Sequence, residues 1–253
     1  MAAATSAPVT SSTPSTCSEV GGGYSYDACG PTTAVPGSTR TYYADDLAYQ
    51  QTAGTNRQTW QLDAGLRFRS WTIETNSSGT WSQTQAKTNR YSDDSDNPNR
   101  IVEDTAATLT RNVTNATGSL TATTGKTNGT VLQLSDIHGD ISPRLPLDTV
   151  LAPTTPDNDE NGATRAGQST QRYGRLGGKQ RSSETLTGLT LMGVRLYDPI
   201  TARFLQTDPV FGGNCNAYDA LPGDPSDHRY QDHTAVNGAW SPARRSRAGD
   251  GSP

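Results

Sequence analysis

Apolar and polar residues alternate in short stretches along much of this chain, separated by turns rich in glycine, asparagine and aspartate. Leu66 and Phe68 share one parity, and Trp71 and Ile73 share the opposite one. A period of two predicts β-strands, and the change of parity predicts either a β-bulge near Ser70 or a strand with both faces partly covered. Helical periodicity is weak throughout. We therefore expect a mostly β protein.

An aspartate that closely follows an aromatic or apolar residue recurs in the N-terminal part of the chain. Asp27, Asp45 and Asp63 are evenly spaced, 18 residues apart, and Asp93 follows after 30 more. The shorter interval is sufficient for a hairpin of two short strands with its turns. These words therefore predict a degenerate repeat of antiparallel hairpins.

Composition limits the core that such hairpins can build. Of the 253 residues 31% are apolar and the formal net charge is -4, while the mean hydropathy is -0.71. With glycine counted and tyrosine left out, the apolar share is roughly 37%, below the ~45–50% usual for globular domains. Ordering each residue costs on the order of 1–2 kcal/mol of backbone entropy. The alternatives are a hydrated β architecture, a fragment of a larger assembly, or substantial disorder.

Several classes of protein are disfavoured. No apolar run approaches the ~20 residues of a membrane-spanning helix, and the first residues lack the basic and apolar regions of a secretory signal. The cysteines (Cys17, Cys29 and Cys215) form no CxxC unit, so we expect no zinc site. The mild acidity, with no basic cluster before residue 240, argues against nucleic-acid binding.

Changes of composition divide the chain into five predicted segments. They are a low-complexity linker (1–20), degenerate repeats (21–145), a loop rich in proline, threonine and aspartate (146–171), a dense segment (172–219) and a tail of different character (220–253). The tail contains no sequence pattern typical of a β-strand. We therefore expect the tail, like the linker, to be disordered.

Two Asp-Pro pairs, Asp198-Pro199 and Asp208-Pro209, lie ten positions apart in the dense segment. Each proline fixes its own φ and pushes the aspartate before it into extended geometry, so each pair predicts a strand-to-turn corner. If the carboxylates lie close together they share one proton, and one acts as base while the other acts as acid. Arg195 or Arg203 would orient them or stabilise negative charge. The alternative is that both aspartates accept only turn hydrogen bonds.

The words of the dense segment resemble the RHS repeat-associated core, the C-terminal signature of the RHS/YD-repeat family. In family order they are Arg172-Tyr173-Gly174, Thr187-Gly188-Leu189, Tyr197-Asp198-Pro199, Asp208-Pro209 and Asn216-Ala217-Tyr218. Residues 21–171 show a weaker resemblance, best in Tyr24-Ser25-Tyr26-Asp27. The chain is accordingly similar to a fragment of such a protein: its last repeats and most of its core.

The resemblance implies antiparallel YD-repeat hairpins that form part of a hollow β shell enclosing a C-terminal effector or toxin. The implied partners are the remainder of the shell and the effector with its immunity protein. The implied localisation is secreted or cell-associated in bacteria. In some relatives the core is an aspartyl self-protease, which would assign catalysis to Asp198 and Asp208. A hollow shell would also require fewer apolar residues than a solid core. A strip of such a shell leaves strand edges open and strands poorly covered, so we expect that the chain does not fold stably alone.

Two departures from the family pattern are visible. Ala202 stands where the family usually has glycine before the Arg-Phe pair, and alanine would be strained there if φ is positive. The sequence after Asn216-Ala217-Tyr218 matches the family's usual continuation only weakly, and we expect no effector domain after it. A frameshift at this point is our hypothesis for the change of composition.

Other candidate chemistry is weaker. Asp157, Asp159 and Gly162 match the opening of a calcium loop, but Gln168 stands at its twelfth position in place of glutamate, so a polar turn is the prediction. We expect no metal and no cofactor. A surface module that binds glycans through exposed Trp60, Trp71 and Trp81, and a non-functional fragment, remain as alternatives.

Overall fold

The computed structural model describes residues 17–20, 23–28, 30–104, 106–127, 129–207 and 218, which include an almost uninterrupted series of β-strands. The predicted mostly β fold is confirmed. Within these ranges no helix is both long and apolar enough to cross a membrane. We expected disorder in residues 1–20 and 220–253. Residues 17–20 instead form a strand, and the rest of both segments lies outside the described ranges.

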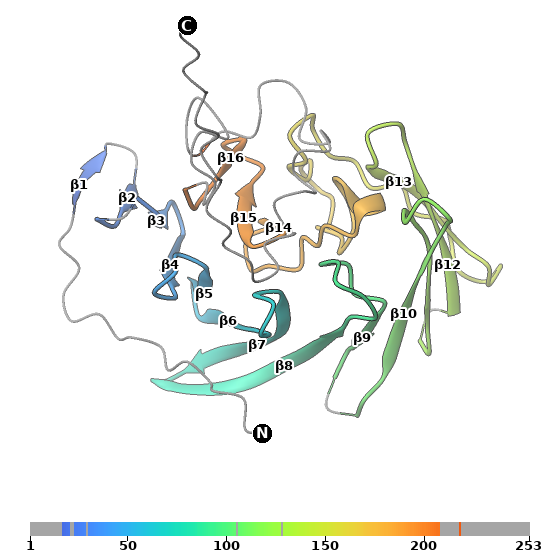
Figure 1. The fold of residues 1–253 in the computed structure, drawn as a ribbon, viewed down its shortest axis with the longest axis horizontal. Helices are drawn as coiled ribbons and strands as arrows, with labels where there is room; N and C mark the ends of the chain where they lie inside the picture. Colours follow the sequence, from blue (N-terminus) through green and yellow to red (C-terminus); the bar gives the residue numbers. More distant parts are fainter. Residues whose placement is uncertain are drawn as a thin grey trace, which may run out of the picture.

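The first thirteen strands form one antiparallel sheet in which every strand pairs with its neighbours in sequence. In Figure 1 this sheet is a curved wall that runs from β1 through β7 and β8 to β13. The strands are β1 (Cys17–Val20), β2 (Tyr24–Tyr26), β3 (Thr32–Val35), β4 (Ser38–Tyr42), β5 (Ala48–Ala53), β6 (Asn56–Leu62), β7 (Phe68–Ser77), β8 (Thr80–Arg90), β9 (Arg100–Val102), β10 (Leu109–Thr114), β11 (Leu120–Gly125), β12 (Gly129–Ser135) and β13 (Ile141–Pro146).

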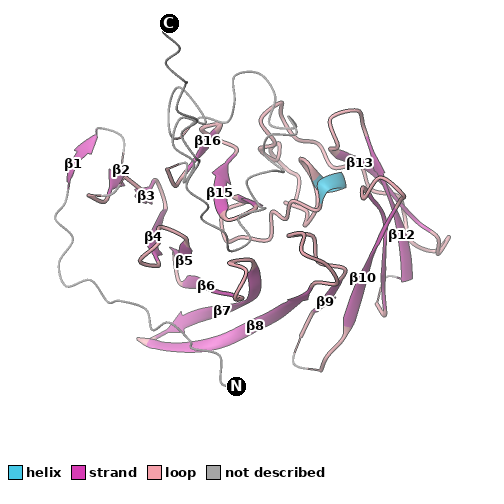
Figure 2. Cartoon of the chain, viewed as in Figure 1, coloured by secondary structure: helices cyan, strands magenta, loops and turns pink. Residues whose placement is uncertain are grey.

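A second, three-stranded sheet lies inside the curve of the first (Figure 1). Its strands are β14 (Thr190–Met192), β15 (Arg195–Asp198) and β16 (Arg203–Phe204). The described helix is a single 3-10 turn, η1 (Gly177–Lys179), which Figure 2 shows near β13. The concave side of the wall is thus occupied by the chain's own C-terminal part.

One type of turn recurs along the chain, and Asp63 of the predicted repeat lies in it. At Asp63 the backbone carbonyl accepts a hydrogen bond from Leu66 (3.0 Å), and the side chain accepts from the N–H groups of Gly65 (2.9 Å) and Arg67 (3.0 Å). The same side-chain pattern is repeated at Asn115, Asp136 and Asp159. The aspartates therefore fix hairpin geometry, as Asx turns do.

The even spacing of the aspartates does not correspond to an even spacing of turns. The second turn begins at Tyr43, whose carbonyl accepts from Asp46 (3.1 Å) and whose N–H donates to Leu47 (2.8 Å). Asp45 lies inside this turn, two positions beyond the place that Asp63 occupies in its own. The repeat is real as a series of hairpins, but Asp45 has a different position in it.

The predicted bulge is present between β6 and β7. Gln61 pairs with Ser70 and Leu62 pairs with Phe68, so Arg69 is the extra residue, one position from the predicted one. The bulge turns both Phe68 and Trp71 into buried positions. A two-residue period without the bulge would have exposed one of them.

The main hydrophobic cluster joins the wall to the inner sheet. Ala48, Trp60, Phe68 and Trp71 come from the wall, and Leu189, Leu191, Leu196 and Leu205 come from the C-terminal part. Trp60 is 0% exposed and Trp71 5%. The interpretation of these two tryptophans as an exposed glycan-binding surface is therefore wrong, because the inner sheet covers them.

Ala202 has a φ of +55°, in the left-handed region that glycine tolerates and alanine does not. We predict that Ala202→Gly raises the free energy of unfolding by about 1 kcal/mol, because it removes this strain. Equilibrium urea unfolding followed by circular dichroism measures the change. Ala86→Gly in the middle of β8 is the matched control and lowers stability by roughly 0.5–1 kcal/mol; equal losses in both variants would contradict the strain.

Candidate functional site

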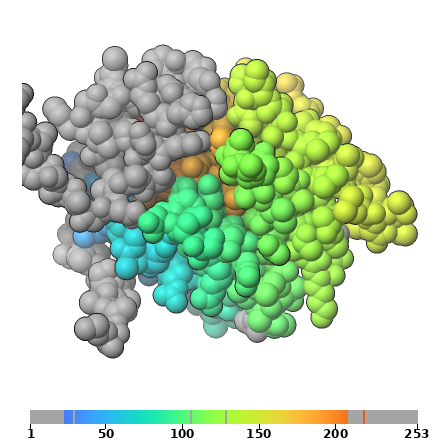
Figure 3. Space-filling model, turned by 45° about the vertical axis from the view of Figure 1, so that its right-hand side comes forward, coloured from blue at the N-terminus to red at the C-terminus, as the bar shows by residue number. Residues whose placement is uncertain are grey.

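The segment of residues 172–207, here called the core segment, crosses the concave face of the wall. At one end Ile141 donates to the carbonyl of Gly174 (2.9 Å) and Gly178 donates to that of Gly139 (2.8 Å). At the other end Thr32 donates to the carbonyl of Leu205 (2.7 Å). The space-filling view in Figure 3 shows orange atoms of this segment between the green and yellow-green hairpins. The site of interest is this contact between wall and core segment.

Buried amides of the wall bind the core segment where apolar side chains would otherwise be expected. Gln51 donates to the hydroxyl of Thr187 (2.7 Å) and Gln58 to the carbonyl of Glu184 (2.9 Å), and both glutamines are 0% exposed. A buried amide is stable only when hydrogen bonds replace its lost hydration. These contacts explain part of the low apolar content.

Asn112 on β10 is a second polar anchor. Its amide nitrogen donates to the carbonyl of Pro98, the hydroxyl of Tyr173 and the side-chain oxygen of Gln180, each at 2.8 Å. Burial raises the pKa of the Tyr173 hydroxyl to about 12, so that this group stays neutral as an acceptor and donor. Two residues of the core segment are thus held by one side chain of the wall.

Four charged side chains form a compact cluster at the same contact. Lys87 on β8 lies 2.5 Å from Glu184 and 3.0 Å from Glu103, and Arg172 lies 2.7 Å from each of these carboxylates. Lys87 also lies over the ring of Trp71, at 5.1 Å from its centre. Two members come from the wall and two from the core segment, so the cluster is an electrostatic clamp between them.

The charge cluster depends on the ionised state of Glu103. Burial by itself would raise the pKa of this carboxyl, but the hydrogen bonds and positive charge of Arg172, together with Thr110 and Lys87, outweigh it and hold the pKa at about 2. The same two carboxylates raise the pKa of Arg172, against the effect of its burial. At neutral pH Glu103 and Arg172 are therefore both charged.

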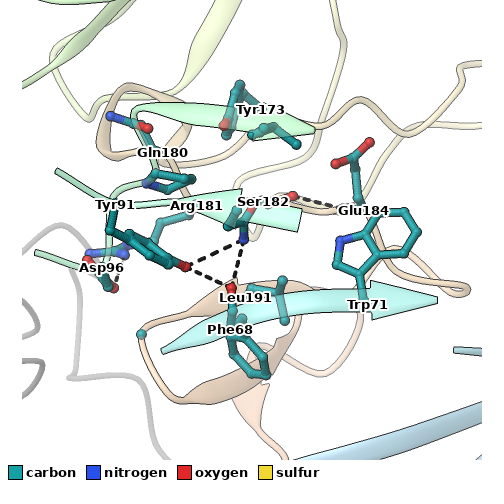
Figure 4. Close-up of a pocket in the computed structure, with 14 residues that line it drawn as sticks. Phe68, Trp71, Tyr91, Asp96, Tyr173, Gln180, Arg181, Ser182, Glu184 and Leu191 are labelled. Atoms are coloured by element: carbon teal, nitrogen blue, oxygen red, sulfur yellow. Dashed lines mark hydrogen bonds and ion pairs between the residues drawn. The ribbon is translucent and has the colours of Figure 1, made fainter. Parts of the chain in front are cut away.

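A small cavity of about 40 Å³ lies beside the charge cluster (Figure 4). Tyr91 donates from its hydroxyl to the carbonyl of Phe68 (2.8 Å), and Asn89 donates to the same oxygen (2.9 Å). Arg181 forms an ion pair with Asp96 at the rim. A volume of this size holds a few water molecules and no larger ligand.

Asp198 lies at the end of β15 and is only 4% exposed. Its side chain accepts from the N–H of Ile200 (3.0 Å), which is an Asx turn. Burial lowers the pKa of the nearby Arg40, and Tyr42 and Asp198 oppose that shift. A positive charge from the wall thus faces this carboxylate of the core segment.

The two predicted arginines differ in their surroundings. Arg195 is buried, 5% exposed, and its guanidinium lies 3.8 Å from the centre of the Phe204 ring. Arg203 is exposed and pairs across the strands with Asp198. Asp208 lies outside the described residues. The structure therefore brings Asp198 and Arg203 to opposite positions of one strand pair, and the proposed pairing of Asp198 with Asp208 stays a prediction.

The calcium-like loop is built as a turn. Asp159 accepts from the N–H groups of Asn161 (2.9 Å) and Ala163 (2.8 Å), and Asp157 lies 3.1 Å from Arg165. Across the described ranges no group of three or more histidine, cysteine, aspartate or glutamate side chains is arranged to hold a metal ion.

Sequence reasoning did not identify the charge cluster or Asn112. Arg172 was singled out only as part of a family word, and Lys87, Glu103 and Glu184 carry no local signal. Their partners lie up to 97 residues away along the chain. Only knowledge of the strand register would have placed them together.

Comparison with known proteins supports the fold. No family model and no curated protein match the chain. Similar solved structures include the TcdB2-TccC3 crystal structure, at 16% identity and a TM-score of 0.57, over 77% of this chain and 10% of that one. The TcdB2-TccC3-Cdc42 crystal structure has 16% identity and a TM-score of 0.59, over 79% of this chain and 10% of that one.

A structure of the Photorhabdus luminescens Tc holotoxin pore, with a substitution in TccC3, has 18% identity and a TM-score of 0.59, over 79% of this chain and 10% of that one. At these identities the likeness shows the fold alone. The chain spans about a tenth of the length of these structures. The chain therefore has the same β fold as the matched part of these structures.

We predict that Glu103→Gln lowers the free energy of unfolding by roughly 2–4 kcal/mol at neutral pH, because Arg172 and Lys87 lose a partner at a partly buried place. The folded-state pKa of Glu103 lies below its ordinary value of 4.5, so its contribution is fully present above that pH and is lost as the pH falls toward about 2. Urea unfolding at a series of pH values measures both effects.

Glu74→Gln is the matched control for this prediction. Glu74 also binds an arginine, Arg57 at 2.6 Å, but on the outer face and without a second cation. Its replacement costs at most about 1 kcal/mol. A Glu103→Gln variant as stable as Glu74→Gln would show that the charge cluster does not clamp the two parts.

Proposed function

We propose that this chain is a structural segment of an RHS/YD-repeat shell that encapsulates a C-terminal effector or toxin, and that the core segment closes the wall. The observation that supports this most directly is the contact described above. An apolar cluster, buried amides and the charge cluster all hold the core segment on the concave face. The fold similarity to chains of a toxin complex agrees with a shell role.

The uncovered part of the concave face supports contact with an unfolded cargo. A groove of about 730 Å³ lies over β10–β13, and polar side chains such as Thr110, Thr123, Gln133 and Arg144 line it. Hydroxyls and amides can hydrogen-bond a polypeptide backbone without requiring a particular side chain. A wall of this kind holds many sequences weakly, which suits an effector domain that must later leave.

The implied partners follow from this role. They are the remainder of the shell, which would continue the sheet, and an effector with its immunity protein. The corresponding localisation is secreted or cell-associated. The similar structures are about ten times longer than this chain, which leaves room for such partners in a full-length protein.

Protection of a cargo from protease tests the proposal. The chain, joined to the remainder of the proposed shell, is fused after residue 253 to a protease-sensitive reporter. We expect the reporter to resist protease concentrations that digest it when free. Leu196→Asp, at a 0% exposed position of the apolar cluster, should remove the protection. Ile200→Asp, at a 77% exposed position in the turn between β15 and β16, should keep it.

Digestion of the reporter at the same rate with and without the shell would overturn encapsulation. Full protection in the Leu196→Asp fusion would contradict the closing role of the core segment. Circular dichroism of each fusion confirms that the β content is retained.

Self-cleavage by an aspartyl mechanism is the second candidate, favoured by the burial of Asp198 beside Arg40. Buried carboxylates near a cation are typical of functional sites, although structural ion pairs share this feature. In this reading Asp198 and Asp208 hydrolyse a peptide bond in cis, with Arg195 and Arg203 orienting them.

We predict that any cleavage fragment seen by mass spectrometry of the fusion disappears in Asp198→Asn and Asp208→Asn. Asp148→Asn is the matched control, because the Asp148 carboxylate accepts the same kind of turn hydrogen bond, from the N–H of Val150 (3.0 Å), at an exposed place. Unchanged cleavage in the first two variants would exclude the aspartate pair. Loss of cleavage in all three would indicate a folding defect and not catalysis.

A further inference from the structure

Three arginines from three strands form one row across the outer face of the wall. Arg90 on β8 pairs with Arg100 on β9, and Arg100 pairs with Arg111 on β10. The next residues along β9 and β10, Ile101 and Asn112, are 4% and 6% exposed and face the core segment. Because side chains alternate along a strand, the arginines point to the opposite, convex side.

The three arginines of this row are not neutralised by acidic side chains of the described residues. All three arginines are exposed. In the part of the chain that the structure describes, none of them forms an ion pair or donates a side-chain hydrogen bond. Directly opposite residues have Cβ atoms about 4.5–5.5 Å apart, and like charges at that separation oppose strand pairing. The row therefore does not contribute to the stability of the sheet.

Hydrogen-bond donors continue the row beyond the arginines. Arg111 pairs with Thr124, and Thr124 pairs with Thr130. The hydroxyls of the two threonines lie 3.0 Å apart. A line of guanidinium groups and hydroxyls across five neighbouring strands offers donors to a series of oxyanions.

Apolar side chains flank the row on the same face. Leu109 and Val113 lie two positions before and after Arg111 on β10, and they are 48% and 37% exposed. The outward face of β10 thus alternates an apolar, a cationic and an apolar group. A ligand that fits this surface has an anionic group between apolar ones.

We propose that the outer face of β8–β10 is a docking surface for an acidic segment of a protein partner, in which carboxylates alternate with apolar side chains. The planar fork of arginine matches a carboxylate with two parallel hydrogen bonds. Leu109 and Val113 give the apolar contact that a sulfated polysaccharide would not use. The net charge of -4 repels a long polyanion such as a nucleic acid, and the row offers no aromatic ring for base stacking.

The surface is independent of the proposed shell function. The closure of the wall uses the concave side chains, and the arginines use the opposite parity of the same strands. A chain that encloses nothing would still present this row.

Fluorescence anisotropy with a labelled synthetic peptide tests the proposal. Glutamate occupies every second position of this peptide, and leucine and serine occupy the positions between in turn. We expect binding to the full chain in low salt. Replacing Arg90, Arg100 and Arg111 together by glutamine should weaken the affinity about tenfold, since exposed ion pairs each contribute a fraction of a kcal/mol to about 1 kcal/mol. Arg100→Gln alone should weaken it about threefold.

The matched control replaces Arg69, Lys126 and Arg165, exposed basic residues outside the row, by glutamine. It removes the same charge and should leave the affinity within about twofold. The double variant Leu109→Ser, Val113→Ser should lower the affinity for this peptide. It should not lower the affinity for a fully acidic peptide that lacks leucine. Thermal melts establish that every variant is folded. We expect the arginine variants to fold, because they remove repulsion between like charges.

Three outcomes would overturn the proposal. The first is that the peptide does not bind in low salt, and the second is that the row and control variants lose the same affinity. The third is that heparin, duplex DNA or anionic lipid vesicles bind through the same arginines more tightly than the peptide does. The last result would assign the surface to a different class of partner.

Discussion

The packing of the core segment against the concave face is the constraint on which the rest of this structure depends. A single antiparallel sheet has two faces, and one of them must be covered for the strands to be stable. Trp60 and Trp71 are buried only because Leu189 and Leu196 lie against them. Each such side chain contributes about 1.5–3 kcal/mol when it leaves water, and neither half of the cluster can bury itself alone.

The polar part of this contact explains how a chain with few apolar residues can hold a fixed structure. Gln51, Gln58 and Asn112 hold backbone and side-chain groups of the core segment. The charge cluster of Lys87, Glu103, Arg172 and Glu184 does the same with ions. Hydrogen bonds are directional, so these contacts fix the register of the core segment more strictly than an apolar surface would. Buried ion pairs add little net stability, but loss of one partner is costly, and this makes the contact sensitive to a single defect.

Features that depend on neighbouring residues could be predicted from the sequence, and features that depend on register could not. The strands and the bulge next to Ser70 follow from local periodicity. The positive φ at Ala202 was suggested only by the glycine that the resembling family usually has at this position. The burial of Trp60 and Trp71 required knowledge of what covers them.

Likewise, no basic cluster is visible before residue 240, because Arg90, Arg100 and Arg111 are ten or eleven residues apart. Pairing of β8, β9 and β10 brings them into one row. The candidate site was predicted only in part: Asp198 and Arg195 are buried together in one strand, but the side chains that clamp the core segment come from distant hairpins.

The two-residue period of the strands separates two kinds of chemistry on one wall. At β9, Ile101 faces the core segment while Arg100 faces outward, and at β10 Asn112 and Arg111 are divided in the same way. A substitution at one parity therefore changes closure, and a substitution at the other changes only the outer surface. A shift of register by one residue would exchange the two sets and place the arginines against the core segment, where the cost of desolvating them opposes this register. The outer arginines, although they weaken strand pairing slightly, thus also exclude the wrong register.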